Sequence, residues 1–245
     1  MFARIAGRYD LLNHLLSAGI DRRWRRRAVR AAGELGGRRA VDACCGTGDL
    51  ALELGRAGAR VVGVDFTPQM LSRAEGKARA ARGRGAADGV PLFALGDALR
   101  LPVATGAADL ASVAFGIRNV ADRGAGLREL GRVVRPGGRV LVLEFATPAG
   151  AVLGRLYRFY FTRVLPAIGR LVSGDADAYR YLPRTVLAWP SPAELQAEME
   201  ALGFERCGHE PLTGGVACLH WGVVPMGGLG GGLGGGLGGG LGARG

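Results

Sequence analysis

The chain has 245 residues, 48% of them hydrophobic, which fits one α/β domain with a large buried core. Its formal net charge is +11, and almost all of the positive charge comes from arginine, because Lys77 is the only lysine. A chain rich in arginine, alanine and glycine also follows from GC-rich coding, so the charge favours an anionic partner without identifying one. No uncharged apolar run of about 18 residues is present, and we expect no transmembrane helix.

The cysteines and the N-terminal residues indicate a cytoplasmic protein. Cys44 and Cys45 are adjacent, whereas Cys207 and Cys218 lie far along the chain, so no disulfide scaffold is indicated. We expect reduced thiols that act as small buried residues. The first residues lack the apolar segment of a secretory signal. No cluster of histidines, cysteines and acids has metal-ligand spacing, and we predict no metal.

Strand and helix patterns alternate after a helical segment of about thirty residues. We predict strands at about 39–44, 60–65, 91–95, 109–115 and 139–145. The helices between them are expected at about 49–57, 68–82 and 122–134, the last stopped by Pro136-Gly137-Gly138. This βαβ order predicts a doubly wound, mostly parallel sheet with right-handed crossovers.

The pattern changes after residue 150. A helical, aromatic-rich stretch (151–172) and an irregular segment (173–191) precede a helix at about 192–202, for which Ser191 is a suitable N-cap. Two short strands, at about 205–212 and 216–223, predict an antiparallel hairpin at the edge of the sheet. We therefore expect one domain over 1–225. The Gly-Gly-Leu-Gly repeats of 226–245 predict a disordered tail.

A glycine-containing loop follows the first predicted strand, in the run Val41-Asp42-Ala43-Cys44-Cys45-Gly46-Thr47-Gly48-Asp49. Gly46 and Gly48 allow the backbone to turn tightly and to approach a ligand. Asp65 ends the second strand, where a carboxylate can accept both hydroxyls of a ribose. Together, these residues predict a nucleoside pocket at the carboxyl edge of the sheet.

Two further acids favour S-adenosylmethionine as the ligand. Asp42 would repel the pyrophosphate of a nicotinamide cofactor but suits a ligand with an ammonium and a sulfonium. Asp97, in Gly96-Asp97-Ala98 after the third strand, can accept from an adenine amino group. Thr47 is a candidate partner for the carboxylate of the cofactor, with an ordinary turn residue as the alternative.

The sequence resembles the quinone-biosynthesis C-methyltransferases, which act on demethylmenaquinone and on polyprenyl methoxy-benzoquinols. The resemblance runs from about Phe2 to about Gly222. Besides the glycine loop, it rests on these segments: Tyr9-Asp10-Leu11-Leu12-Asn13, Trp24, Ala114-Phe115-Gly116-Ile117-Arg118-Asn119-Val120, Arg132 to Gly138, Leu143-Glu144-Phe145, Tyr179-Arg180-Tyr181-Leu182 and Leu212-Thr213-Gly214-Gly215. The Phe-Gly-Ile-Arg-Asn and Tyr-Arg-Tyr-Leu segments are the most specific.

This resemblance implies transfer of a methyl group from S-adenosylmethionine to a prenylated quinol ring, with demethylmenaquinol as the first expectation. It implies that Thr47, Asp65, Asp97, Ala98 and Ala114 contact the cofactor. The family often has a serine at the position of Ala114, so only a backbone contact is expected there. Whether the ring is a naphthoquinol or a benzoquinol stays open.

Four residues are candidates for the acceptor site. Arg118 and Asn119 leave the fourth strand at the ligand edge and would hold the quinol oxygen, with Arg118 stabilising a phenolate or orienting a water. The alternative for Arg118 is a structural ion pair, for example with Asp122 or Asp175. Tyr9 and Tyr181 would bond the ring oxygens or close over the site, with core packing as the alternative.

Apolar and basic residues of 151–172 and the arginines of 22–30 predict peripheral contact with anionic membrane, with solvated arginines as the alternative. A homodimer is kept open. The competing functions are a methyltransferase for RNA or another small molecule, a nicotinamide oxidoreductase and a non-catalytic partner protein. Nucleic acid is disfavoured because no Pro-Pro-aromatic motif follows the fourth strand.

Overall fold

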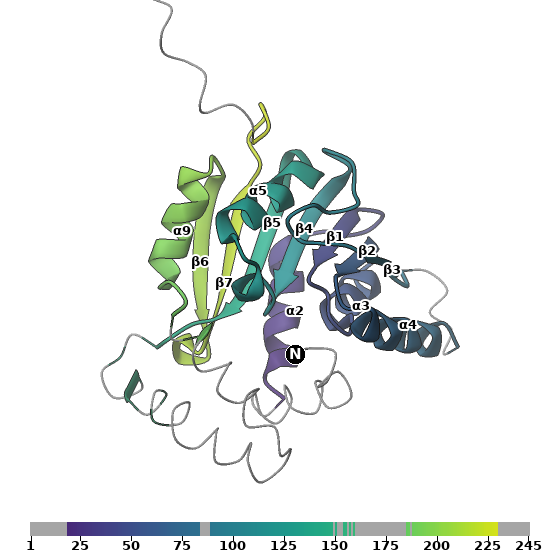
Figure 1. Cartoon of the computed structure of the whole chain (residues 1–245), viewed down its shortest axis with the longest axis horizontal. Helices are drawn as coiled ribbons and strands as arrows, with labels where there is room; N and C mark the ends of the chain where they lie inside the picture. Colours follow the sequence, from purple (N-terminus) through teal and green to yellow (C-terminus); the bar gives the residue numbers. More distant parts are fainter. Residues whose placement is uncertain are drawn as a thin grey trace, which may run out of the picture.

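A computed structural model describes residues 19–83, 89–148 and 188–229, together with positions 150, 154, 155, 157, 159, 185 and 186. Seven strands form one sheet in the order β3-β2-β1-β4-β5-β7-β6 (Figure 1). The strands are β1 (Arg39–Ala43), β2 (Arg60–Asp65), β3 (Leu92–Leu95), β4 (Ala108–Ala114), β5 (Val134–Phe145), β6 (Glu205–Leu212) and β7 (Ala217–Val223). Strands β1 to β5 pair in parallel, and β7 runs antiparallel to β5 and β6. The predicted fold class is confirmed.

Helices cover both faces of the sheet, which explains why β4 is buried along almost its whole length (Figure 1). On one face, α2 and α3 pack through two apolar clusters, which include Trp24 and Leu54. On the other face, α5 and α9 enclose the largest cluster, around Leu127 and Leu195. The helices are α2 (Asp21–Ala32), α3 (Asp49–Arg56), α4 (Pro68–Gly83), α5 (Arg123–Val133) and α9 (Pro192–Ala201), with 3-10 turns η1 (Ile117–Asn119) and η3 (Thr213–Gly215).

The fifth strand begins earlier than predicted. Val134 is already extended, with φ −89° and ψ 135°, and it pairs with Ala108. The Pro136-Gly137-Gly138 segment therefore lies inside β5, where the register shifts, instead of separating the helix from the strand. Gly138 permits this bend because a Cβ there would come within 2.5 Å of Val134 Cγ1.

Side chains near both ends of the sequence hold the N-terminal helix on the hairpin. The indole Nε1 of Trp24 donates to Thr213 Oγ1 at 2.8 Å, across 189 residues of sequence. Arg27 Nε donates to Glu210 Oε1 at 2.9 Å. The segments around Trp24 and around Thr213, which the sequence analysis singled out independently, thus contact each other. This contact fixes α2 at the carboxyl edge of the sheet.

Ser191 caps α9 as predicted, in a capping box with Glu194. In the predicted tail, residues 226–229 are described, and Leu229 packs beside Phe204 and Gly131. The expectations for 1–18, for most of 151–187 and for 230–245 lie outside the described residues. No helix in the described ranges is both long enough and apolar enough to cross a bilayer.

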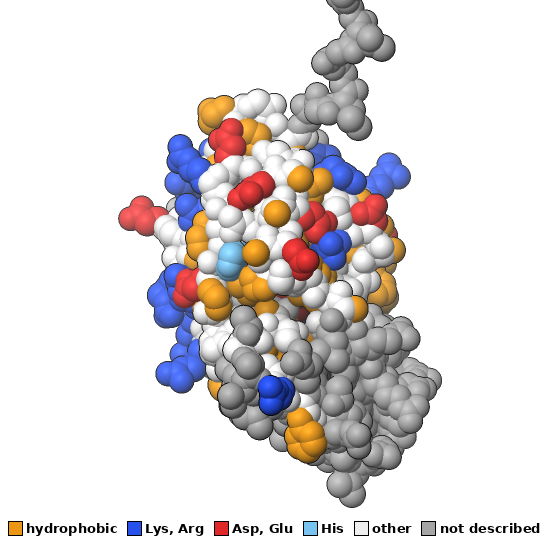
Figure 2. Space-filling view, turned by 90° about the vertical axis from the view of Figure 1, so that its left-hand side faces the viewer, with side chains coloured by type: hydrophobic (Ala, Val, Ile, Leu, Met, Phe, Trp, Pro, Cys, Tyr) orange, Lys and Arg blue, Asp and Glu red, His pale blue; other side chains and the backbone are white. Residues whose placement is uncertain are grey.

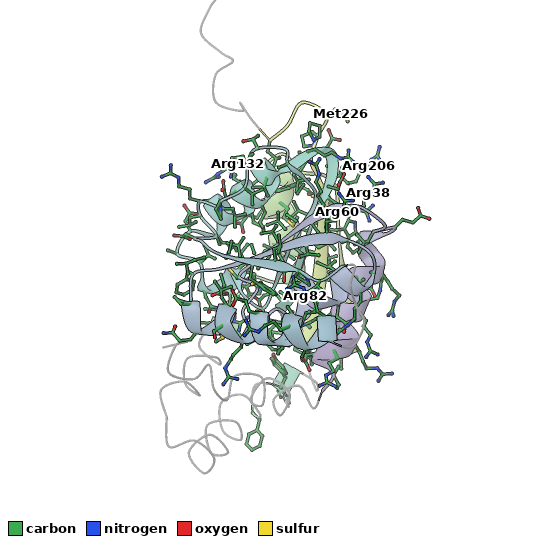
Figure 3. The ribbon with its side chains drawn as sticks, turned by 90° about the vertical axis from the view of Figure 1, so that its right-hand side faces the viewer. Arg38, Arg60, Arg82, Arg132, Arg206 and Met226 are labelled. Atoms are coloured by element: carbon green, nitrogen blue, oxygen red, sulfur yellow. The ribbon has the colours of Figure 1, made fainter. Side chains whose placement is uncertain are left out.

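The arginines are spread over more than one region of the surface. Arg38, Arg60 and Arg206 lie toward the end of the molecule where β1 and β2 begin, opposite the carboxyl edge (Figure 3). On the face that carries α9 and β6, acidic and apolar side chains occupy most of the centre of the view, and most of the basic side chains lie toward its margins (Figure 2). This face shows no single continuous basic patch.

Candidate active site

The glycine loop lies where the sheet order reverses, between β1 and β4, which is the usual ligand position in doubly wound folds. Asp42 pairs in register with Ser112, whose hydroxyl donates to Asp42 Oδ1 at 2.8 Å. Asp42 is 1% exposed, and its Oδ2 has no hydrogen-bond partner among the described residues. Burial raises the pKa of Asp42 to about 7, against the lowering effects of the Ser112 hydrogen bond and the Arg25 charge. This carboxylate therefore has a free acceptor atom for a cationic ligand group.

The loop has a strained backbone on both sides of the reversal point. Cys44 after β1 and Phe115 after β4 have φ values of 50° and 56°. Residues other than glycine rarely adopt positive φ values. Gly48 has φ 80°, and a Cβ there would lie 2.7 Å from Phe93. Gly116 lies directly against the loop, since its Cβ would come within 2.4 Å of Cys44 Cβ. The residues that follow β4, Phe115 and Gly116, which we call the strand-four exit, thus pack directly against the glycine loop.

Asp65 is 7% exposed and holds the loop in place. Its Oδ2 accepts from the backbone N–H of Gly46 at 2.9 Å, and its Oδ1 accepts from that of Thr67 at 2.9 Å. A carboxylate has about four acceptor positions, so two remain for ribose hydroxyls. Asp97 is exposed at the next strand end and accepts from Leu99 N–H at 2.9 Å. The structure brings both predicted acids to the same edge.

A chain of charged side chains surrounds Thr47. Lys77 Nζ donates to Thr47 Oγ1 at 2.8 Å and to Asp49 Oδ1 at 2.7 Å. The other oxygen of Asp49 lies 3.6 Å from Arg25 Nη1, which also donates to Asp21 at 2.5 Å. Helices α2, α3 and α4 are therefore linked around the loop by alternating charges.

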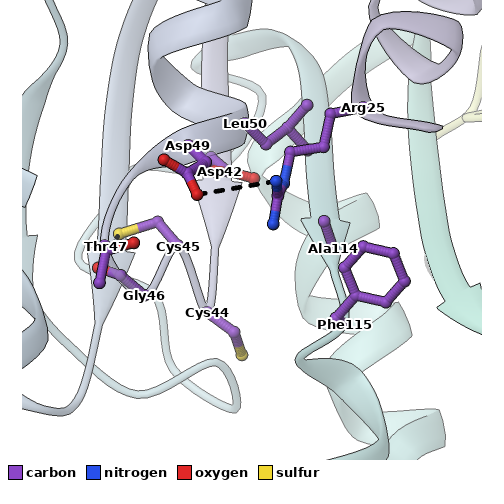
Figure 4. A pocket seen from close by; sticks show the side chains of 10 residues that line it. All are labelled: Arg25, Asp42, Cys44, Cys45, Gly46, Thr47, Asp49, Leu50, Ala114 and Phe115. Atoms are coloured by element: carbon purple, nitrogen blue, oxygen red, sulfur yellow. Dashed lines mark hydrogen bonds and ion pairs between the residues drawn. The ribbon is translucent and has the colours of Figure 1, made fainter. Parts of the chain in front are cut away.

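A small hollow of about 40 Å³ lies inside this arrangement (Figure 4). Arg25 enters it from α2, opposite the loop residues 44–47, and the guanidinium points toward Asp42 and Asp49. Ala114 and Phe115 form the wall on the β4 side. Drug-sized ligands occupy roughly 300–1,000 Å³, so this hollow fits only a small polar end of a cofactor.

Arg118 is engaged in a buried ion pair, but with a partner that the sequence did not predict. Its Nη1 donates to the Phe115 carbonyl oxygen at 2.7 Å and pairs with Glu144, whose side chain is 1% exposed. Asp122 instead caps α5 through the backbone N–H of Ala125, so that alternative partner is wrong. The other, Asp175, lies outside the described residues.

The Arg118–Glu144 ion pair does not satisfy every hydrogen-bonding atom of the two side chains. Arg118 Nε and Glu144 Oε2 are both buried without a hydrogen-bond partner in the described part of the chain. Desolvation raises the pKa of Glu144, although the Arg118 charge opposes this. Buried polar atoms without partners are rare, and at a strand exit they indicate a site prepared for a ligand or a water.

Aromatic rings separate Arg25 from Arg118. Arg25 lies 5.9 Å from the Phe115 ring, and Arg118 lies 5.3 Å from the Phe145 ring. The two phenyl rings are 4.6 Å apart between centroids. Phe115 in this layer is buried and Phe145 is half-buried.

Cys44 and His220 are poorly suited to act as a nucleophile or a base near neutral pH. Burial raises the pKa of the Cys44 thiol to about 12, so the thiol stays protonated near neutral pH. All four cysteines are free thiols. Burial lowers the pKa of His220 to about 4, and its Nε2 contacts the Pro192 carbonyl oxygen at 3.1 Å. Within the described ranges, no group of three or more potential metal ligands is found.

Comparison with known proteins identifies the family. The model of the ubiE/COQ5 methyltransferase family matches residues 1–224. The chain belongs to the ubiE/COQ5 methyltransferase family. This membership confirms the resemblance seen in the sequence and removes the nicotinamide oxidoreductase as an interpretation.

Relatives within this family cover almost the whole chain. The demethylmenaquinone methyltransferase of Thermus thermophilus is 52% identical over 227 residues, which are 92% of this chain and 100% of that protein. The ubiquinone/menaquinone biosynthesis C-methyltransferase UbiE of Syntrophotalea carbinolica is 49% identical over 224 residues, 91% of this chain and 92% of that protein. A solved structure of magnesium protoporphyrin IX methyltransferase from Synechocystis, with bound SAH, has the same fold, with TM-score 0.57, 22% identity and 83% coverage of both chains.

In this ubiE/COQ5 member, the structure brings all of the described candidate residues to one edge. Asp42, Gly46, Thr47 and Ala114 line the hollow. The others on this edge are Gly48, Asp65, Asp97, Ala98, Arg118 and Asn119. Tyr9 and Tyr181 lie outside the described residues.

Sequence reasoning gave Glu144, Arg25 and Lys77 no role in the site. It assigned Arg25, as one of the arginines of 22–30, to contact with anionic membrane, and the burial of Arg25 shows that this was wrong for that residue. The sequence does single out Glu144, because it is an acidic residue between the apolar residues Leu141-Val142-Leu143 and Phe145. Arg25 and Lys77 have no such signal. Arg25 is one of several arginines in its helix, and only burial distinguishes it.

Proposed function

We propose that the chain transfers the methyl group of S-adenosylmethionine to a ring carbon of a prenylated quinol, most directly demethylmenaquinol. Family membership and the names of the relatives support a quinone-biosynthesis C-methyltransferase. The main structural support for S-adenosylmethionine as the cofactor is the buried Oδ2 of Asp42, which has no partner among the described residues. It lies in a hollow that the guanidinium of Arg25 also lines. Asp42 would hold the ammonium of the cofactor, Asp65 the ribose and Asp97 the adenine edge. The bound cofactor supplies an electrophilic methyl on a sulfonium.

The acceptor chemistry requires a phenolate and removal of one ring proton. The ring carbon ortho to the phenolate forms the new C–CH₃ bond as the S–CH₃ bond breaks, and the ring proton then passes to a water molecule, which restores aromaticity. Arg118 is suited to stabilise the phenolate oxygen, because Glu144 and the Phe115 carbonyl hold its guanidinium in one orientation. Asn119 follows it in the same turn. Aromatic rings beside Arg118 exclude water from the reacting atoms.

A second cavity, of about 720 Å³, opens beside Arg118 and has the size of an ordinary ligand pocket. Ile117, Val120, Trp189 and Leu202 contribute apolar lining, and charged side chains, among them Arg123, Arg128 and Glu198, line the rest. We assign the quinol and the start of its apolar tail to this cavity. Its position next to the strand-four exit would present the ring to Arg118.

Transfer of a labelled methyl group tests this function. We expect the purified chain to move label from S-adenosylmethionine to reduced demethylmenaquinone, with no transfer to RNA. The same assay with a demethylated methoxy-benzoquinol decides between a single acceptor class and both. Binding of the cofactor without transfer to either quinol would instead support a non-catalytic partner protein.

The proposal also places the protein in the cytoplasm at the inner face of a membrane, because a prenylated acceptor resides in the bilayer. Arg22, Arg23 and Arg26 are exposed on α2 and suit anionic headgroups. We expect liposomes with anionic lipid to retain the protein at low salt and to release it at high salt, whereas neutral liposomes should not retain it. Failure of the anionic liposomes to retain the protein would remove membrane contact from the proposal. Whether two copies associate can be measured by light scattering on the protein without liposomes.

A further inference from the structure

Arg25 is a buried cation with no role in the proposed chemistry. Only 8% of the residue is exposed, although it lies in a helix whose other arginines are largely at the surface. Both of its carboxylate contacts among the described residues use Nη1, with Asp21 at 2.5 Å and Asp49 at 3.6 Å. A guanidinium has five N–H donors, so it retains donors for a further anion. Burying arginine in this way is unfavourable unless the charge is matched.

Arg25 belongs to a series of four alternating charges beside the hollow. Asp21, Arg25, Asp49 and Lys77 carry two charges of each sign and are linked in series. Asp42 stands apart from this series, hydrogen-bonded to Ser112 and with Oδ2 unpartnered in the described part of the chain. Arg25 and Asp42 both line the hollow, and the guanidinium points toward the Asp42 carboxylate across it (Figure 4).

We propose that Arg25 binds the α-carboxylate of the cofactor's amino-acid end, while Asp42 binds the α-ammonium across the hollow. A zwitterion places opposite charges against these two groups and adds no net charge to a buried site. The hollow of about 40 Å³ has room for a few water-sized groups, which suits such an end and not a nucleoside. This inference rests on the adenosyl cofactor of the proposed function. It assigns the carboxylate to Arg25 ahead of Thr47, whose hydroxyl already accepts from Lys77.

The position of Arg25 also connects cofactor binding to the N-terminal helix. Trp24, the preceding residue, is hydrogen-bonded to Thr213, and Arg25 lies against the Phe115 ring. A bound carboxylate would therefore fix α2 against the strand-four exit, where Arg118 begins its turn. Arg25 would thus be both a cofactor ligand and a link to the acceptor side.

Calorimetry with matched ligands tests the assignment. The ligands are S-adenosylmethionine, its decarboxylated form, which keeps the ammonium, and 5′-methylthioadenosine, which lacks both groups. We expect the unaltered chain to bind S-adenosylmethionine roughly 10- to 100-fold more tightly than the decarboxylated form, as a charge-assisted hydrogen bond would give. Arg25→Met should remove this difference and leave 5′-methylthioadenosine affinity unchanged.

Two further variants keep the test decisive. Arg25→Lys retains the charge and the pairing with Asp21, so it should fold even if Arg25→Met does not, and it should reduce the discrimination only in part. Arg30→Gln is the matched control on the exposed side of α2 and should bind all ligands as the unaltered chain does. Equal loss of affinity for all three ligands in Arg25→Lys, or retained discrimination in Arg25→Met, would overturn the inference. If the unaltered chain bound none of the ligands, that result would contradict both the cofactor of the proposed function and this inference.

Discussion

Arg118→Met should abolish methyl transfer to the quinol and should lower the free energy of unfolding by about 3–5 kcal/mol. The activity is lost because the phenolate loses its cation. The stability is lost because Glu144 is fully buried and would keep a carboxyl group without its partner. Urea unfolding and the labelled-methyl assay measure the two effects separately.

The double variant Arg118→Met/Glu144→Leu separates the catalytic from the structural role of Arg118. Replacing both members of a buried ion pair with apolar side chains is often neutral for stability. We therefore expect the double variant to recover most of the unfolding free energy but none of the activity. A stable double variant with normal methyl transfer would show that Arg118 is only a structural residue.

The second large effect concerns Asp42 and is a pH dependence. Because burial raises the pKa of Asp42 to about 7, the folded apoprotein keeps a proton that the unfolded carboxyl loses near pH 4. The folded state therefore loses stability as the pH rises from about 4 to about 7, by on the order of 4 kcal/mol, since each pKa unit corresponds to about 1.4 kcal/mol. Above pH 7 this contribution no longer changes. Asp42→Asn should remove it, and the variant should be more stable than the unaltered chain at pH 8.

Cofactor affinity, unlike the stability of the folded apoprotein, should increase as the pH rises toward 7. The ammonium of the cofactor favours the ionised form of Asp42, so binding below pH 7 must release a proton from that carboxyl. Calorimetry at pH 6 in two buffers of different ionisation enthalpy should detect the release of up to one proton, and Asp42→Asn should abolish it. Proton-independent binding at pH 6 would contradict the contact between Asp42 and the ammonium.

Local sequence patterns predicted most of the fold because the signals are short-range. Burial on both faces makes β4 apolar at most of its positions, and Ser191 with Glu194 forms a capping box within four residues. The fifth strand was misplaced for a related reason. Pro136-Gly137-Gly138 indicates a break locally, but Val134 is kept extended by its pairing with Ala108 on the neighbouring strand.

By itself, the sequence determined the α/β class, the glycine loop and the acids at the strand ends, because parallel strands bring their carboxyl ends to one edge. Only the tertiary structure decided which charges meet there. The Arg118–Glu144 and Arg25–Asp49 pairs depend on the sheet order and on the docking of α2, which joins Trp24 to Thr213 across 189 residues. Such pairings leave no local pattern, since each charged residue would look the same on a solvated surface.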